Sequence, residues 1–414
     1  MISIALSILC LQVPSPAARP EAPDPEAAVR DFAPLLGDPA ARDRALDRLA
    51  HAGKPVLALL EACGVDAPTL SLLRETVDLH AALGESYGPP RLLTFDGKEE
   101  SLGALLSRFE VGSGMTFHKH AVDLSSLHSL ALKDATFWQA LDALSRKVPF
   151  TYQPYQGDQL YLNAGPPAEK PVCYHGPFRV ALDRVILQRR VGFDRTTEDL
   201  SARLHILWEN HVSPLGLTRK FRLSRAEDDT GASLILPPPE TPAPEASRPA
   251  VTMRVPYETL DVGPLRPLSA AAKRIAALEG TLGIEFPSRV DKVVFEKPGG
   301  SAETRPLEGV SVELRSFAAT GSSGVTAEFV LRFREEKEAA AYRASARDVT
   351  FVPLAGTAQP VQVTESRLEK GVLTFSVRVF RVAAPREIKE LVLRVPRGIR
   401  TMEVPFRYRD VELR

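Results

Sequence analysis

The sequence has little of several features that define common protein classes. It has 3 cysteines and 7% aromatic residues, and its 52 Lys and Arg balance its 52 Asp and Glu, so the net charge is zero. Scarce cysteine excludes a disulfide scaffold, and balanced charge argues against a strongly basic nucleic-acid binder. Beyond the first residues no apolar run approaches the roughly 20 residues that span a bilayer as a helix. No nucleic-acid partner and no transmembrane span in the mature chain are therefore expected.

The familiar catalytic motifs are also missing. The sequence has no G-x-S-x-G of a serine hydrolase, no G-x-x-x-x-G-K-[ST] phosphate loop, no G-x-G-x-x-G after a strand and no H-E-x-x-H. It has no C-x-x-C and no zinc-finger spacing. These absences predict no cofactor and favour a non-enzymatic protein.

What is present is typical of a folded chain with several domains. Hydrophobic residues make up 44% and charged residues 25% of the sequence, close to the globular average. The 414 residues exceed the usual domain size of roughly 100–200 residues. The 35 prolines indicate many turns, strand ends and linkers.

The first 18 residues resemble a secretory signal. A short apolar run, Ile4–Val13, is followed by the small residues Ala17 and Ala18. No Lys or Arg precedes the run, so either the start codon is called too late or the export signal is weak. The alternative to a signal peptide is a buried first helix. We expect a signal peptide over 1–18, a linker over 19–24 and an exported, periplasmic or envelope-associated protein.

Residues 25–86 have the period of helices. Asp24 before Pro25 is an N-cap signal, and Asp38-Pro39 repeats it. In the second helix Ala41, Ala45, Leu46 and Leu49 are expected to face the core, with Arg42, Asp43, Asp47 and Arg48 outside. The phrase GDPAARDRALDRLAHAGKPVLALL resembles one HEAT-type repeat, and the resemblance implies helical hairpins that lean on a neighbouring domain.

Residues 87–166 alternate between the strand and helix periods in the order β-α-β-β-α-β-β. The phrases LLTFDGKEESLGALLSRFEVGSGMTF and LALKDATFWQALDALSRKVPFTYQPYQGDQLYLN carry this pattern. They resemble the short N-terminal (STN) domain of secretins and TonB-dependent receptors. Since no secretin barrel follows, the resemblance does not imply a pore.

The remainder alternates apolar and polar residues as strands do. We expect two antiparallel β-sandwich modules, 172–298 and 299–414, with an exposed Pro-rich loop at 237–249 in the first. The stretches LGIEFPSRVDKVVF (282–295) and LVLRVPRGIRTMEVPF (391–406) resemble each other. They indicate a weak internal repeat or a chance likeness between two hairpins.

The expected whole is an exported α+β protein of several domains. It resembles uncharacterised exported bacterial proteins that join a HEAT-like segment, a secretin-type small domain and β-sandwiches. The resemblance implies a non-enzymatic interaction or assembly module of the cell envelope, with protein partners and no assigned activity.

An enzymatic alternative depends on Asp229. The run Asp229-Thr-Gly-Ala-Ser233 is similar to the loop of retroviral-type aspartic peptidases, which need two facing carboxylates. Glu227 and Asp228 stand where that family has apolar residues, and no second Asp-Thr-Gly exists, so the twin would come from a homodimer. The competing interpretation is a hairpin turn, with Asp228 and Asp229 bonding local N–H groups and Gly231 at positive φ.

Two further sets of residues are candidates, one for a metal site and one for a disulfide. His118 and His120 are two apart on an expected strand and share a face, and His128 would have to return on a neighbouring strand to complete a zinc site with them. The alternative is solvent-facing polar residues. Cys63 and Cys173 could form one disulfide, or be two buried thiols.

Overall fold

In a computed structural model, the described residues are 22–412 apart from 39–40, 121, 156–158, 168, 192–195, 237–256, 300, 321–323, 337, 340–341, 343–347, 355–358 and 381–384. The expected signal peptide and Pro-rich loop lie outside the described residues. The chain is a mixed α+β protein dominated by antiparallel strands, as the sequence predicts at this level.

Contacts divide the chain into two units. The larger unit comprises Ala17–Ala246, Met253–Arg289 and Ile399–Arg414, and the smaller is built on Val290–Gly398. This differs from the predicted modules 172–298 and 299–414, because the last residues return to the larger unit. The cause is a pair of very long strands, β11 (Arg274–Glu296) and β19 (Ile388–Glu412), each of which contributes to both units. The two similar stretches lie in these strands, which are neighbours in one sheet.

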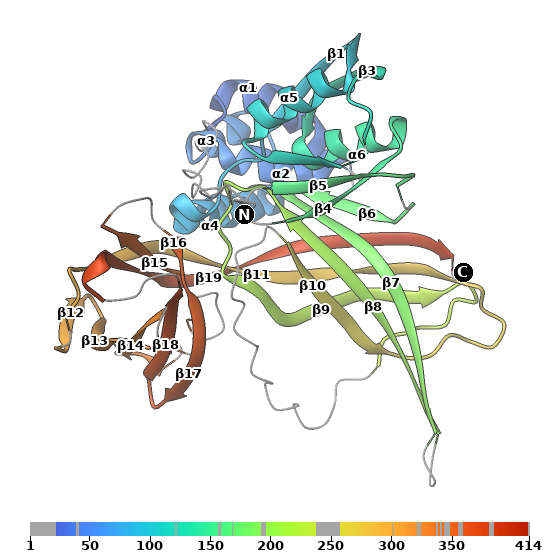
Figure 1. Ribbon diagram of the computed structural model, residues 1–414. Coiled ribbons are helices and arrows are strands. Elements are labelled where there is room, and N and C mark those ends of the chain that lie inside the picture. The colour runs from blue at the N-terminus through green and yellow to red at the C-terminus, as the bar shows by residue number, and fades with distance from the viewer. Residues whose placement is uncertain are drawn as a thin grey trace, which may run out of the picture. The chain divides into compact units, whose positions relative to one another are not determined.

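The N-terminal part of the larger unit is helical (Figure 1). Its elements are α1 (Pro25–Phe32), η1 (Ala33–Gly37), α2 (Arg42–His51), α3 (Pro55–Ala62), α4 (Ala67–Leu83) and η2 (Gly84–Ser86). Asp24 caps α1, since its carboxylate accepts the Ala27 N–H at 2.9 Å, as expected. Helix α2 begins at Arg42, three residues after the predicted proline start.

The next segment has the predicted β-α-β-β-α-β-β order. Its elements are β1 (Leu92–Ser101), α5 (Leu102–Ser113), β2 (Thr116–His120), β3 (Leu127–Thr136), α6 (Phe137–Lys147), β4 (Phe150–Pro154) and β5 (Gln159–Ala164). Strands β1 and β3 form one antiparallel sheet, and a second has the order β2-β5-β4, with β2 and β5 parallel. A capping box of Thr136 and Gln139 starts α6. Both helices pack on one core that contains Phe109, Phe137 and Trp138.

The rest of the larger unit consists of long strands. One sheet has the order β10-β8-β7-β6, from β6 (Val172–His175), β7 (Phe178–Val191), β8 (Thr196–Trp208) and β10 (Tyr257–Leu265). Strand β9 (Gly216–Asp228) pairs with β11. A turn at Gly176 separates β6 from β7, and Ser233 forms only an isolated bridge, to Glu227. Figure 1 shows β7 and β8 as a long twisted hairpin that extends away from the helices.

The smaller unit has its own core. One sheet has the order β12-β13-β14-β18-β17. These strands are β12 (Glu303–Leu307), β13 (Val310–Ala319), β14 (Gly324–Phe333), β17 (Gln362–Glu369) and β18 (Val372–Phe380). β15 (Asp348–Pro353) pairs with β16 (Gln359–Pro360) and with β19, before which lies η3 (Pro385–Glu387). Phe329, Phe375 and Leu391 are among the buried residues between the sheets.

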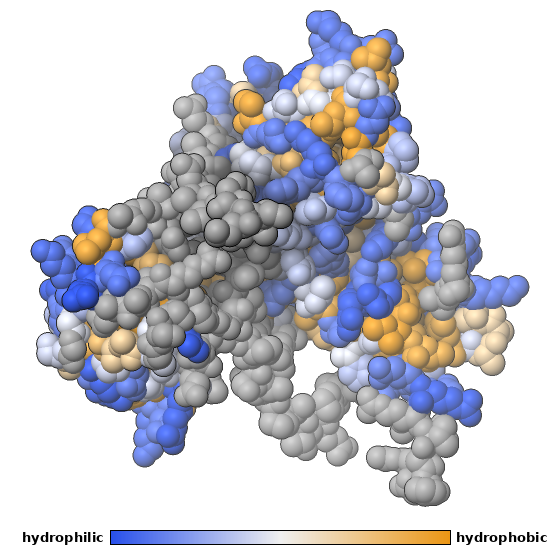
Figure 2. All heavy atoms as spheres, in the orientation of Figure 1, coloured by the Kyte–Doolittle hydropathy of each residue, from blue (hydrophilic) through white to orange (hydrophobic). Residues whose placement is uncertain are grey.

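The surface of the larger unit mixes polar and apolar residues. In Figure 2 hydrophobic residues gather over β1, β3 and α6, and again beside β7. Among the described side chains of β3 and β7, the most exposed large apolar ones are Leu127 and Leu187, at 61% and 60%. No helix within the described part of the chain is long and apolar enough to cross a membrane.

Candidate functional site

A buried carboxylate on α2 lies against two histidines. Asp47 and His51 are one helical turn apart and share a face of α2, while His80 approaches from α4. Asp47 Oδ1 lies 3.6 Å from His51 Nε2 and 3.7 Å from His80 Nε2. The two imidazole rings are 4.3 Å apart between centroids, and no side chain of the three is more than 8% exposed. The helices thus assemble an Asp-His-His cluster in the interior.

A second layer of residues closes this cluster. The Tyr87 hydroxyl donates to Asp47 Oδ1 at 2.9 Å, and its ring stacks on His51 at 5.2 Å between centroids. Gly176, in the β6–β7 turn at φ +52°, is so close that a Cβ there would lie 2.8 Å from the Tyr87 hydroxyl oxygen and 3.2 Å from Asp47 Oδ2. A side chain at position 176 would collide with the cluster, so the turn needs glycine.

The Asp47 carboxylate is ionised in this setting. Burial alone would raise the pKa of Asp47, but its electrostatic interactions with His51, His175, His80 and Arg48 lower that pKa to about 2. A buried carboxylate that stays charged needs cationic partners, because an isolated buried charge is strongly unfavourable.

The prediction that Asp47 and Arg48 face solvent is wrong. They are 3% and 7% exposed, because α2 is covered on one face by other helices and contacts β6 as well. The hydropathy pattern places charged residues outside by default. The signal that could have found the cluster is an Asp and a His at i, i+4 on a helix, with a further His on a nearby predicted helix.

A second buried carboxylate, Glu209, follows β8. It is 1% exposed; its Oε2 accepts the Arg91 N–H at 2.9 Å and lies 3.5 Å from His211 Nδ1. Burial raises the pKa of Glu209 to about 8, although the Arg91 N–H and the charges of Arg91 and Arg48 act in the opposite direction. Arg48 also interacts with Asp47, so the two buried acids share one cation.

The raised pKa of Glu209 predicts a loss of stability as pH rises. Between the ordinary value of 4.5 and about 8, the folded protein holds a proton that the unfolded chain has released. The contribution of Glu209 protonation to the free energy of unfolding is therefore complete below about pH 4.5, and it is lost as the pH rises toward 8. This group alone contributes a slope of roughly 1.4 kcal/mol per pH unit.

Glu209→Gln keeps a neutral side chain at every pH and should flatten this slope. Urea unfolding of the larger unit at pH 5, 6, 7 and 8 checks the prediction. The variant is expected to match the natural chain near pH 5 and exceed it at pH 8. Parallel stability curves for the two proteins would show that Glu209 is ionised in the folded state.

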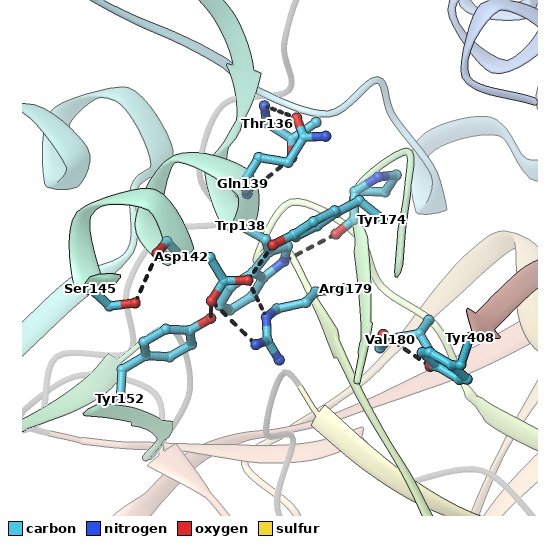
Figure 3. Close-up of polar contacts among 11 residues, drawn as sticks. Thr136, Trp138, Gln139, Asp142, Ser145, Tyr152, Tyr174, Arg179, Val180 and Tyr408 are labelled. Carbon is cyan, nitrogen blue, oxygen red and sulfur yellow. Dashed lines mark hydrogen bonds and ion pairs between the residues drawn. The ribbon is translucent and has the colours of Figure 1, made fainter. Parts of the chain in front are cut away.

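A third buried carboxylate, Asp142 on α6, joins four elements (Figure 3). Arg179 on β7 donates to it twice, from Nε to Oδ2 at 2.8 Å and from Nη2 to Oδ1 at 3.2 Å. The Tyr152 hydroxyl donates to Oδ1 at 2.5 Å and the Tyr174 hydroxyl donates to Oδ2. Burial raises the pKa of both tyrosines, which keeps them protonated as donors. Four donors occupy both carboxylate oxygens of Asp142. The residue therefore links α6 to β4, β6 and β7.

The structure brings together only two of the three histidines considered for zinc. His118 and His120 lie on the outer face of β2, as predicted from their spacing. His128 lies on β3, opposite Glu100 of β1 in the other sheet, and its Nε2 is 2.9 Å from Ser126 Oγ. Among the described residues, three or more ligand atoms of His, Cys, Asp or Glu come together at one place, the Asp47 cluster.

His118 and His120 instead belong to an exposed aromatic face on the β2-β5-β4 sheet. Tyr161 of β5 is opposite His118, and their rings stack at 5.6 Å between centroids. Tyr155 packs edge-on against both rings at 5.5 Å, and the His118 Nε2 atom lies 2.9 Å from Gln159 Oε1. We call His118, His120, Tyr155 and Tyr161 the aromatic face.

Asp229 lies in a turn. The neighbouring Asp228, 1% exposed, holds that turn: its Oδ1 accepts the N–H groups of Thr230 at 2.9 Å and Ala232 at 3.0 Å. Gly231 has φ +85°. Asp229 accepts the Lys273 N–H at 3.1 Å, and its Oδ2 lies 3.9 Å from Arg274 Nε. These are the contacts of the hairpin-turn interpretation, with Asp228 as the central carboxylate.

We expect Asp229→Asn to change the unfolding free energy by about 1 kcal/mol or less, because an amide oxygen still accepts the Lys273 N–H. Asp228→Ala is the comparison, and it should lower the thermal midpoint clearly more, since it removes the acceptor of several N–H groups. Both midpoints can be read from circular dichroism. Cleavage of peptides in acid by the natural chain, lost in Asp229→Asn, would contradict this assignment.

The two cysteines are not bonded to each other. Cys63 is exposed at the end of α3, so the expectation of a buried thiol is wrong for it. Cys173 on β6 is partly buried, and burial raises the pKa of its thiol, which donates to the Arg407 carbonyl at 2.8 Å.

Comparison with known proteins does not assign this chain to a family. No protein family matches it, and no curated protein matches it. A solved structure described as the conserved domain protein from Bacillus anthracis is similar over 58% of this chain and 89% of its own, with 10% identity and a TM-score of 0.18. A likeness this weak says nothing about the fold or activity of this chain.

Proposed function

We propose that the chain is a non-enzymatic, exported module of the cell envelope that binds a protein partner through the aromatic face. The proposal includes the layout expected from the sequence, with a HEAT-like segment, a secretin-type small domain and β-sandwich modules. The observation that carries it is a set of stacked, solvent-facing aromatic side chains on a sheet whose other face is fully used by the core.

The composition of the face supports a protein partner. Tyr161 and His118 are held in a fixed stack before any partner arrives, so ordering them costs little entropy on binding. Tyrosine combines a large apolar ring with a hydroxyl that can hydrogen-bond, and it is enriched at protein interfaces. Tyr155 is 44% exposed, which leaves ring surface available to a partner.

The position of β2 supports an extended segment as the contacting part of the partner. Strand β2 is at the edge of the β2-β5-β4 sheet. An edge strand presents backbone donors and acceptors along one side, and a partner strand can pair with those that are unused. On β2 the Phe117 N–H already donates to Glu110 Oε1 at 3.1 Å. Such a strand would lie beside His118 and His120, whose side chains would contact its alternate residues.

Site-specific photo-crosslinking in the source cell tests the proposal. A photoreactive residue at Tyr155 should give one adduct of defined mass, and the adduct should be reduced by Tyr161→Ala. The matched control places the same residue at the exposed Glu75 on α4, where no such adduct is expected. Equal adducts at positions 155 and 75, or none at 155, would contradict the proposal.

Export can be checked independently of binding. The apolar run followed by Ala17 and Ala18 predicts cleavage after position 18. Chain recovered from the envelope fraction should therefore begin near Arg19, as measured by N-terminal sequencing or intact mass. Chain that retains Met1 and stays in the soluble cytoplasmic fraction would rule out export.

A further inference from the structure

We propose that Asp47, His51 and His80 bind one divalent transition-metal ion, with zinc as the best fit. The ligand atoms of the three residues lie within 4.8 Å of one another. This site is separate from the aromatic face, and it does not depend on the proposed function.

The spacing of the three atoms favours a shared ion over direct hydrogen bonds. Asp47 Oδ1 lies 3.6 and 3.7 Å from the two imidazole Nε2 atoms, beyond the 2.7–3.2 Å of an ordinary hydrogen bond. Two ligands each about 2.0–2.1 Å from a zinc ion, at tetrahedral or somewhat wider angles, are about 3.3–3.6 Å apart. The two separations from Asp47 Oδ1 are therefore close to those of neighbouring ligands around one ion.

The chemistry of the donors also fits. Two imidazole nitrogens and one carboxylate oxygen form a set that zinc accepts, and imidazole also suits copper, nickel and iron. Calcium and magnesium prefer oxygen ligands and larger coordination numbers. The set therefore selects for a transition metal and against the common hard cations.

The surroundings supply what a metal site needs beyond its ligands. Tyr87 donates to the same Asp47 Oδ1 and would hold the carboxylate in position. The close approach of Gly176 to Asp47 covers the site from the β6–β7 turn. Residues of α2 and α4 would then be joined through one ion, which would fix the helical segment in its fold.

Zinc titration of the purified full chain, after removal of metal with a chelator, tests the proposal. One equivalent of zinc should bind saturably and raise the thermal midpoint, whereas magnesium should not. Asp47→Asn, which can still accept the Tyr87 hydroxyl, and His80→Gln should each weaken zinc binding by more than about 100-fold, and Tyr87→Phe by about 10-fold.

The double variant His118→Ala/His120→Ala is the matched control, because it removes the exposed histidine pair. It should bind zinc as the natural chain does. Loss of zinc binding in this control, unchanged binding in Asp47→Asn, or no saturable binding to the natural chain would overturn the proposal.

Cobalt substitution keeps the test valid if the buried variants fail to fold. Co²⁺ bound to the natural chain should show the visible absorption of a four- or five-coordinate ion with nitrogen and oxygen ligands. A thiolate charge-transfer band would instead place the metal at Cys63 or Cys173 and overturn the assignment. A purely octahedral, solvated spectrum would overturn it as well.

Discussion

Trp138→Ala is expected to lower the unfolding free energy of the larger unit by roughly 3–5 kcal/mol, the range for large-to-small changes in a core. Trp138 is fully buried on α6, packs edge-on against Phe137 at 4.8 Å between centroids, and donates its indole N–H to the Pro177 carbonyl at 3.2 Å. The substitution therefore creates a cavity and removes a bond between α6 and the β6–β7 turn.

Denaturant unfolding followed by circular dichroism measures this effect, and the remaining tryptophan, Trp208, provides a fluorescence signal within the larger unit. Val111→Ala is the matched control. Val111 is also on a helix, α5, of the segment from β1 to β5, but is 89% exposed, so its loss should change stability by no more than about 0.5 kcal/mol. A cost below about 1 kcal/mol for Trp138→Ala would contradict the core assignment.

Asp142→Ala should be about as damaging, at roughly 3–5 kcal/mol. The change leaves the Arg179 guanidinium, whose side chain is 12% exposed, without its carboxylate, and it removes the acceptor of the Tyr152 and Tyr174 hydroxyls. An unpaired buried charge costs more than the intact pair contributes. Tyr152→Phe is the milder comparison, because it removes one hydrogen bond worth about 1 kcal/mol.

A double change separates charge burial from packing. Replacing both partners, Asp142→Leu with Arg179→Met, should recover much of the stability lost in Asp142→Ala, since no buried charge remains. The comparison is made by denaturant unfolding under identical conditions. A double variant no more stable than Asp142→Ala would show that packing around α6, and not the ion pair, governs the loss.

The sequence predicts best where local signals agree. The segment from β1 to β5 alternates between helix and strand periods, and its caps and turns are made by neighbours in the sequence, as with Thr136 and Gln139 of α6. Its element order was therefore predictable. The division into modules was not, because alternation within β11 and β19 says nothing about which distant strands they join, and each strand takes part in two units.

The candidate site at Asp47 could not be predicted from the sequence for a related reason. Asp47 is buried because His80, Tyr87 and the Gly176 turn reach it from far along the chain. Hydropathy assigns a charged residue to the surface unless its partners are known, and those partners are distant in sequence. Only the Asp47–His51 spacing was local, and a helical i, i+4 pair of this kind is also common on solvated faces.

Anomalous diffraction at the zinc absorption edge, from crystals of the full chain grown with zinc, tests the central claim most directly. The account predicts one strong anomalous peak enclosed by Asp47 Oδ1, His51 Nε2 and His80 Nε2, at about 2.0–2.2 Å from each. The peak should be missing from crystals of Asp47→Asn. Zinc found only at His118, His120 or Cys63, with none among the three buried side chains, would contradict it.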